Sequence, residues 1–79
     1  MVRLRRESLD VRGLLCPLPV IRTQNRVKVL QPGDVLEVTG TDPGILQDVP
    51  AWCRVNGHRV MEARRGEREY TVELEVGTG

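Results

Sequence analysis

Two prolines on either side of Leu18 restrict this part of the chain to the beginning of a helix. Proline fixes φ near the helical value and lacks an N–H, so it fits the first turn, where the N–H groups have no intrahelical partner. Pro17 and Pro19 therefore predict a helix that begins directly after Cys16, with this cysteine as its N-cap residue. Gly13 lies in the turn that leads into this motif.

An apolar face continues this helix as far as a turn at residues 31–34. At about 100° per residue, the face predicted to pack on the core consists of Val20, Thr23, Val27 and Leu30. Leu18 and Ile21 fall outside that face, within one turn of Cys16. The pattern therefore predicts an exposed apolar patch beside the thiol, which is a candidate surface for a partner protein.

Segments 4–11 and 35–39 flank this helix and are predicted as strands. Two strands joined by one helix pair in parallel through a right-handed crossover, so their C-terminal ends meet at one edge of the sheet. Cys16 follows the first strand, and a loop that contains Asp42 follows the second. Reacting groups collect at such an edge in open α/β sheets. Asp42 is therefore a candidate for contact with a partner, besides its predicted role as the cap of the next helix.

A second helix is predicted to begin at Pro43 and to end at a C-cap pair, residues 56–57. Pro50 is expected to kink or divide it, because proline removes one helical hydrogen bond and crowds the preceding turn. Val55 is predicted on the outer face of this helix and is a further candidate for the surface that contacts a partner protein. The inner face consists of Ile45, Leu46, Val49, Trp52 and Cys53.

The chain ends with two predicted strands, residues 59–64 and 70–76, around a turn near Gly66. The resulting order is βαβαββ, which predicts an α/β two-layer sandwich with two helices on one face of a four-stranded mixed sheet. With 79 residues, we expect one small domain over residues 1–79, whose ordered core covers about residues 8–76.

Charge and hydropathy limit the expected partners and location. Twelve Lys and Arg face eleven Asp and Glu, and the net charge of +1 gives no field that attracts nucleic acid. Residues 1–7 are charged, and no apolar run approaches the roughly 18 residues of a membrane span. We therefore expect a cytoplasmic protein that does not bind a membrane. Nucleic acid is not a favoured partner.

Cys16 and Cys53 are the two cysteines of the chain, and His58 is its one histidine. Their number and spacing fit neither a CxxC redox pair nor a four-ligand zinc site from one chain. Cys53 is predicted to be a core thiol, since a resolving role would need its Cα within about 4.4–6.8 Å of that of Cys16. His58 is expected to begin the third strand and is given no catalytic part.

The position of Cys16 favours a functional thiol over a buried small hydrophobic residue. The partial positive charge of a helix start stabilises a thiolate, so the N-cap position predicts an activated sulfur. No histidine or acid lies close to Cys16 in the sequence, and no general base is therefore predicted. A thiol activated by a helix start alone suits the carriage of a chemical group better than hydrolysis.

Several motifs between residues 8 and 76 resemble those of the TusA (SirA-like) family of sulfur carriers. They are Leu9-Asp10, Gly13-Leu14, Cys16-Pro17-Leu18-Pro19, Gln31-Pro32-Gly33-Asp34, Asp42-Pro43, Asp48-Val49-Pro50 and Gly57-His58. The resemblance implies that Cys16 accepts sulfane sulfur as a persulfide from a cysteine desulfurase or rhodanese-like donor and passes it to an acceptor protein. It implies a sulfurtransferase or carrier without a separate cofactor, rather than an enzyme that turns over a small substrate. It also implies the strand order 1-2-4-3, with the last strand antiparallel to the others.

Leu15 and Leu18 occupy positions at which family members linked to thiolation of the tRNA wobble uridine often carry a basic residue and an acid. The acceptor is therefore open. Thiolation of transfer RNA, molybdenum-cofactor assembly, sulfur oxidation and selenium metabolism are all compatible with the resemblance.

A small RNA-binding or regulatory interaction module is the alternative function. Its surface would consist of Arg3, Arg5, Arg6, Arg59, Arg64, Arg65 and Arg68. A solvated face paired with Glu62, Glu67 and Glu69 is the favoured interpretation, because the sequence offers no aromatic platform for stacked bases. A small peroxidase or reductase ranks third, since the chain has neither a second redox cysteine nor a cofactor motif.

Overall fold

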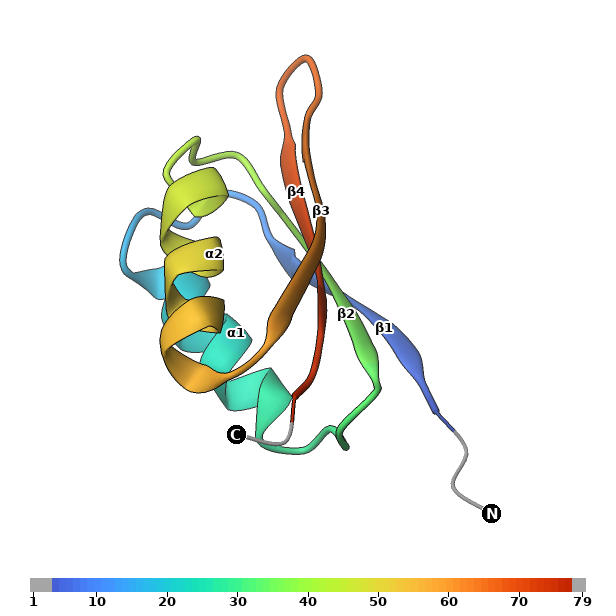
Figure 1. Cartoon of the computed structure of the whole chain (residues 1–79). Helices are drawn as coiled ribbons and strands as arrows, with labels where there is room; N and C mark the ends of the chain where they lie inside the picture. Colours follow the sequence, from blue (N-terminus) through green and yellow to red (C-terminus); the bar gives the residue numbers. More distant parts are fainter. Residues whose placement is uncertain (1–3, 78–79) are drawn as a thin grey trace.

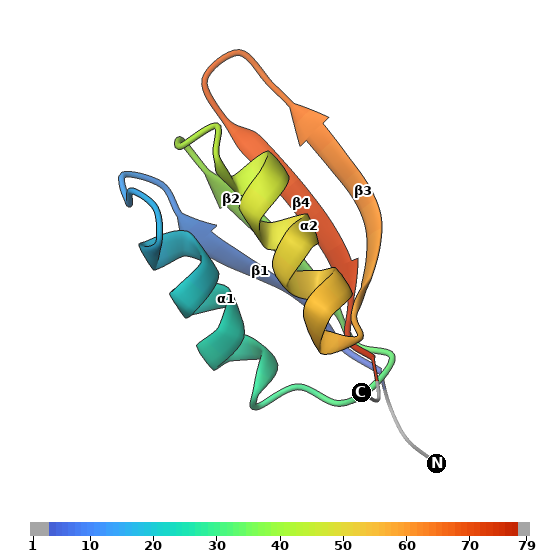
Figure 2. The same ribbon diagram turned by 60° about the vertical axis from the view of Figure 1, so that its left-hand side comes forward.

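The computed structural model describes residues 4–77, which form two helices and four strands. In chain order these are β1 Arg6–Val11, α1 Leu18–Val27, β2 Val35–Gly40, α2 Ile45–Asn56, β3 Arg59–Arg65 and β4 Tyr70–Glu75. Both helices lie on the same face of the sheet, as Figures 1 and 2 show. The predicted two-layer α/β sandwich and its βαβαββ order are therefore confirmed.

The sheet has the order β1-β2-β4-β3. β1 and β2 pair in parallel, from Arg6 opposite Val35 to Val11 opposite Gly40. β4 lies antiparallel to both β2 and β3. The mixed sheet and the strand order implied by the family resemblance are confirmed, and the C-terminal ends of β1 and β2 meet at one edge of the sheet.

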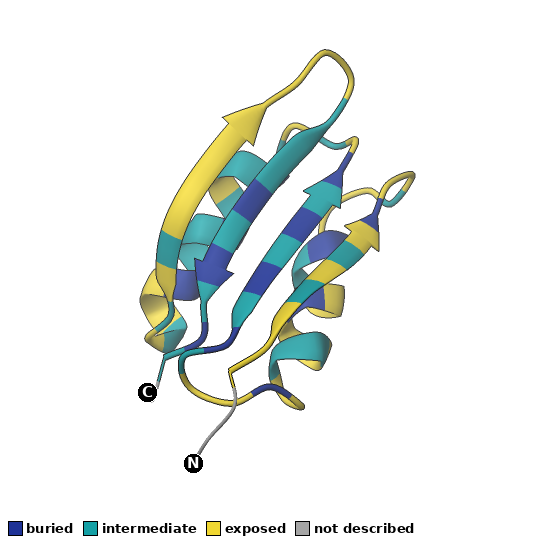
Figure 3. Ribbon diagram, turned by 90° about the vertical axis from the view of Figure 1, so that its right-hand side faces the viewer, coloured by how far each residue is buried: buried dark blue, intermediate teal, exposed yellow. Residues whose placement is uncertain are grey.

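The core lies between the helices and the inner face of β2 and β4. Alternate residues of these two central strands are buried, and dark blue alternates with teal along them in Figure 3. β3 is mostly exposed because it forms the outer edge of the sheet. The buried apolar residues are Val11, Leu30, Leu36, Val38, Ile45, Val49, Cys53, Val72, Leu74 and Val76.

The first helix is shorter than its apolar pattern predicts. α1 ends at Val27, and the chain tightens into turns in which the N–H groups of Val29 and Leu30 donate to carbonyls three residues earlier. Leu30 is nevertheless buried, because these turns bring it back onto the core. The helical projection therefore identified a core residue correctly but assigned it to the wrong element.

The second helix begins at Ile45 rather than at Pro43, and Gly44 is its N-cap. The prediction of Asp42 as cap is therefore wrong by two residues. Pro50 lies inside one continuous helix and does not divide it. Gly57 ends the helix as predicted, with φ of 80°, a left-handed conformation that glycine adopts without the steric penalty of a side chain.

Asp34 connects three segments of the chain, which are the turn at residues 31–34, the residue before β1 and the residue after β4. Its carboxylate, 1% exposed, accepts the backbone N–H of Arg5 at 2.8 Å and that of Gln31 at 2.8 Å. Its carbonyl accepts the N–H of Val76 at 2.8 Å. These N–H donors, together with the guanidinium charge of Arg5, lower the pKa of the carboxyl group despite its burial. The turn at residues 31–34 is thus tied to both the first and the last strand.

Replacement of Asp34 by Asn is expected to lower the midpoint of thermal unfolding by roughly 4–8 °C at neutral pH. The amide accepts at one atom only, so one buried N–H loses its partner. The difference should shrink as the pH falls below 3.8, the ordinary pKa of an aspartate, because a lowered native pKa stabilises the fold only while the carboxyl is ionised. Thermal unfolding followed by circular dichroism at neutral and acidic pH measures both effects.

The matched control is Glu62→Gln, which neutralises an exposed carboxylate on β3. An Asp34→Asn protein that unfolds at the same temperature as the wild type at neutral pH would contradict the role of this carboxylate.

Candidate functional site

Cys16 lies in the loop between β1 and α1, at the sheet edge where β1 and β2 both end. Its side chain is exposed and forms no disulfide. The loop enters through Gly13, whose φ of 81° is left-handed and favours glycine. In Figure 2 this loop and the loop after β2 lie at the same end of the molecule. The predicted meeting of Cys16 with the Asp42 loop is therefore observed.

The sequence pattern predicts Cys16 as the N-cap of α1, and this prediction is wrong, because Cys16 lies one residue before the N-cap. Pro17 occupies the N-cap position, and Leu18 and Pro19 are the first two helical residues. No side chain forms a capping hydrogen bond there. The sulfur therefore lies one residue further from the helix start than expected. This matters because the influence of a helix start on a charge is confined to the first turn of the helix.

The pKa of the Cys16 thiol is raised above its ordinary value, which is opposite to the expected activation. The main cause is a hydrogen bond from Sγ to Oδ2 of Asp48, 3.0 Å long. Desolvation and the negative charges of Asp48 and Asp42 add to it. Carboxylates beside a sulfur disfavour the thiolate, so the free cysteine rests as a protonated thiol.

Sequence reasoning missed Asp48 as a site residue. The contact joins residues 32 positions apart, and it depends on how the first turn of α2 faces the motif. One signal was available: the predicted second helix starts at the same sheet edge as Cys16, so an acid in its first turn lies within reach. No acid lies close to Cys16 along the sequence, but in the folded protein the carboxylate of Asp48 contacts its sulfur.

Asp42 holds the backbone of the motif rather than capping α2. Its Oδ2 accepts the N–H of Cys16 at 2.9 Å, and its Oδ1 accepts the N–H of Gly44 at 2.9 Å. These two backbone bonds lower the pKa of Asp42. The neighbouring Thr41 accepts the N–H of Gly13 through Oγ1 at 2.9 Å. The loop after β2 therefore fixes the cysteine loop at two points.

An exposed apolar patch lies along the chain on both sides of Cys16. Leu18 is 44% and Ile21 is 45% exposed, as predicted, and they lie three residues apart on α1. Leu15, at 73% exposed, extends the group on the other side of the cysteine. We call these three leucine and isoleucine residues the motif patch.

Val55 does not belong to the motif patch. It is 84% exposed, as predicted, but it lies in the last turn of α2. Since α2 begins at the Cys16 edge and rises about 1.5 Å per residue, Val55 lies about 15 Å along the helix from its start. The structure therefore does not bring Val55 to the cysteine.

Cys53 and His58 both have structural surroundings. Cys53 is fully buried in the core, and burial raises the pKa of its thiol to about 11. His58 comes directly before β3 rather than beginning it, its ring stacks on Trp52 with centroids 4.9 Å apart, and its Nδ1 accepts the N–H of Gly77 at 3.0 Å. Burial lowers the pKa of this imidazole.

The arginines of the proposed RNA surface are largely engaged with glutamates on the outer face of the sheet. Arg6 pairs with Glu73 and Glu37, and Arg64 pairs with Glu62 and Glu37. Arg59 lies 3.3 Å from Glu75, and the guanidinium of Arg65 lies over the ring of Tyr70. Arg3 lies outside the described residues. These contacts support a solvated, paired face, but the glutamates that take part in them are Glu37, Glu62, Glu73 and Glu75, of which the sequence predicts only Glu62.

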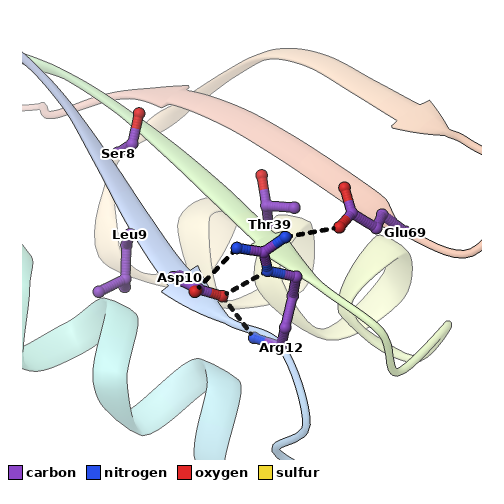
Figure 4. Close-up of a pocket in the computed structure, with 6 residues that line it drawn as sticks. All are labelled: Ser8, Leu9, Asp10, Arg12, Thr39 and Glu69. Atoms are coloured by element: carbon purple, nitrogen blue, oxygen red, sulfur yellow. Dashed lines mark hydrogen bonds and ion pairs between the residues drawn. The ribbon is translucent and has the colours of Figure 1, made fainter.

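A shallow pocket lies on this outer face, away from the thiol. It is lined by Ser8, Leu9, Asp10, Arg12, Thr39 and Glu69. In Figure 4 the guanidinium of Arg12 lies between two carboxylates, and it bonds to Asp10 at 3.0 Å and to Glu69 at 2.9 Å. The charges that face the pocket are therefore already paired.

No cluster of three or more His, Cys, Asp or Glu side chains within residues 4–77 is placed to hold a metal ion. None of the helices described has the length and apolar character needed to cross a membrane.

The fold and the site define a small two-layer α/β protein that presents one thiol at a sheet edge. The chain belongs to the family of sulfurtransferase TusA, whose model matches residues 7–76. It is 41% identical over 69 residues to a protein of Neisseria meningitidis serogroup A that is provisionally named a sulfur carrier, covering 87% of this chain and 93% of the relative.

A second relative is the sulfur carrier protein TusA of Pseudomonas aeruginosa. It is 40% identical over 62 residues, and the alignment covers 78% of each protein. The crystal structure of a SirA-like protein from Desulfitobacterium hafniense superposes with a TM-score of 0.77 at 22% identity, covering 90% of this chain and 97% of the other. That structure supports the fold.

The two cysteines are expected to react with iodoacetamide very differently in the native protein. Cys16 is exposed and should be alkylated with a rate that rises with pH to a midpoint above 9.0, the ordinary pKa of a cysteine, because its pKa is raised. Cys53 should stay unlabelled until the chain is unfolded, since its thiol is buried. Mass spectrometry of trypsin digests after timed alkylation measures each site separately.

Cys53→Ser is the control that leaves one thiol to titrate. A midpoint below 9.0 would show that the helix start dominates after all, and an intramolecular disulfide formed by mild oxidation of native monomer would contradict the separation of the two cysteines.

Proposed function

We propose that this protein is a sulfur carrier that holds sulfane sulfur as a persulfide on Cys16. The observation that carries the proposal is an exposed thiol at the sheet edge, inside the motif of a family whose relatives are named sulfur carriers. Its backbone is fixed by Asp42, so the sulfur is held at a defined position while remaining open to a partner. The persulfide itself is the cargo, and the proposal includes no separate cofactor.

Loading is an exchange between two sulfurs. The Cys16 sulfur attacks the terminal sulfur of a donor protein's cysteine persulfide, the donor S–S bond breaks, and the electron pair stays on the donor sulfur, which leaves as a thiol. Cys16 then carries the persulfide. In the second step an acceptor nucleophile attacks the outer sulfur, and Cys16 leaves with the electron pair. No net oxidation occurs, because the sulfane sulfur moves with its oxidation state unchanged.

The motif patch is the proposed docking surface for the donor and the acceptor. Apolar residues at 44% to 73% exposure on both sides of the reacting sulfur suit a transient protein contact that covers the site during transfer. We propose a cysteine desulfurase or rhodanese-like protein as donor and a cytoplasmic sulfur-acceptor protein as the second partner. Asp42 contributes by holding the loop, since both of its oxygens are engaged with backbone N–H groups.

The first test replaces the proposed sulfur-bearing atom. Cys16→Ser is expected to abolish loading from a cysteine desulfurase supplied with ³⁵S-labelled cysteine, because the hydroxyl does not form a persulfide. Cys53→Ser is the matched control and should load like the wild type, since Cys53 is buried. Radiolabel retained on non-reducing gels measures loading, and full loading of the Cys16→Ser protein would refute the proposal.

The second test separates docking from chemistry. Leu18→Glu places a charge in the motif patch and is expected to slow loading from a desulfurase by roughly tenfold or more, while loading from glutathione persulfide stays close to that of the wild type. Val55→Glu is the control, because Val55 is more exposed but lies at the far end of α2. Equal loading of both variants by the protein donor would contradict the motif patch as the docking surface.

A further inference from the structure

We propose that Asp48 is a catalytic residue of sulfur transfer, which takes the proton of the Cys16 thiol as sulfur arrives and gives a proton back to it as sulfur leaves. This inference rests on the proposed function. It assigns a general acid and base to a site for which the sequence offered none, and it follows from the position of one carboxylate in the first turn of α2.

Asp48 is the acid whose oxygen is directed at the reacting sulfur. Its Oδ2 lies 3.0 Å from Sγ of Cys16, within the range required of a general base. The other nearby acid, Asp42, has both oxygens on backbone N–H groups, one of them that of Cys16 itself. Asp42 therefore positions the cysteine, and Asp48 remains as the group that can accept its proton.

The local structure keeps Asp48 in place. Its backbone N–H donates to the carbonyl of Gly44 at 2.8 Å, which fixes it in the first turn of α2, and its side chain is half-buried. Gly44 leaves room for both acids, since a Cβ there would lie 3.2 Å from Oδ1 of Asp42 and 3.4 Å from Oδ2 of Asp48. The carboxylate is thus held by the helix rather than by a mobile loop.

In the loading step the resting thiol must lose its proton before or as it attacks. The raised pKa of Cys16 means that little thiolate is present at neutral pH. Transfer of the proton from Sγ to Oδ2 of Asp48 lets the sulfur electron pair form the new bond to the donor's terminal sulfur. The donor S–S bond breaks at the same time, and the proton then passes from Asp48 to the donor thiolate, which leaves as a thiol.

In the unloading step Cys16 needs a proton again. A thiol with a high pKa is a slow leaving group when it departs as thiolate. If Asp48 takes up the proton that the acceptor's nucleophile gives up and passes a proton to Sγ as the S–S bond breaks, Cys16 leaves directly as a thiol. Asp48 is then a carboxylate once more, and no proton has to stay on it between the two steps.

The main competing explanation is that Asp48 only suppresses the reactivity of the thiol. The two explanations predict opposite effects of neutralising this residue. Asp48→Asn removes the largest cause of the raised pKa of Cys16, so simple thiolate chemistry should become faster. The groups that face Sγ are Asp48 on α2 and Asp42 in the loop after β2, and the variant leaves the second one unchanged.

The experiment measures sulfur loading of both proteins at neutral pH. Asp48→Asn should load from glutathione persulfide more slowly than the wild type, by roughly tenfold to a hundredfold, whereas an Asp48 that only suppresses the thiol predicts faster loading. Loading is measured under single-turnover conditions by mass spectrometry of the intact chain. Glu62→Gln is the control for loss of one negative charge far from Cys16.

Loading by Asp48→Asn that is as fast as, or faster than, that of the wild type would overturn the inference. That outcome leaves the proposed function standing, provided that the wild type loads and Cys16→Ser does not. If the wild type itself does not load, the proposed function fails instead. If Asp48→Asn does not fold, the test is made on the wild type, whose loading is expected to be slower in deuterium oxide than in water. Equal or faster loading in deuterium oxide would refute proton transfer during the loading step.

Discussion

The parallel pairing of β1 with β2 is the constraint on which the site depends. The last residues of the two strands, Val11 and Gly40, lie opposite each other, so the loops that follow them emerge together. Gly40 permits this approach, because a Cβ at that position would lie 2.9 Å from Cγ2 of Val11. One of the two loops carries Cys16, and the other leads into α2. Every polar contact of the cysteine comes from this second segment.

Much of the fold was predictable because its signals are local. Prolines and glycines separate the elements, and period-2 and period-3.6 patterns identify strands and helices. The handedness rule for parallel strands then placed Cys16 and Asp42 at one edge without any knowledge of side-chain contacts. The errors are also local: α1 starts one residue late because Pro17 takes the N-cap position, and α2 starts two residues late because Gly44 does.

The parts that could not be predicted depend on contacts between distant residues. Asp34 is a turn residue in the sequence, and only the fold shows that it accepts backbone N–H groups from two segments. Asp48 belongs to a motif of the family resemblance, but its chemistry appears only when the angle between α2 and the cysteine loop is known. Because Asp42 and Asp48 are far from Cys16 in the sequence, the charges that surround the thiol could not be predicted either. These charges decide that the pKa of Cys16 is raised rather than lowered.

The charges around the thiol have a consequence for the proposed carriage of sulfur. An exposed thiolate reacts with oxidants and disulfides without discrimination, and susceptibility to oxidation follows thiolate character and exposure. A carrier that exchanges sulfur with two different proteins needs its thiol exposed, so under the proposed function lowering the thiolate content of Cys16 is the remaining means of protecting it. A carboxylate at 3.0 Å provides this protection, and the same carboxylate is placed to remove the proton when a donor persulfide has docked. The acid that lowers the reactivity of the free thiol and the base that we propose for the transfer are, on this argument, one residue.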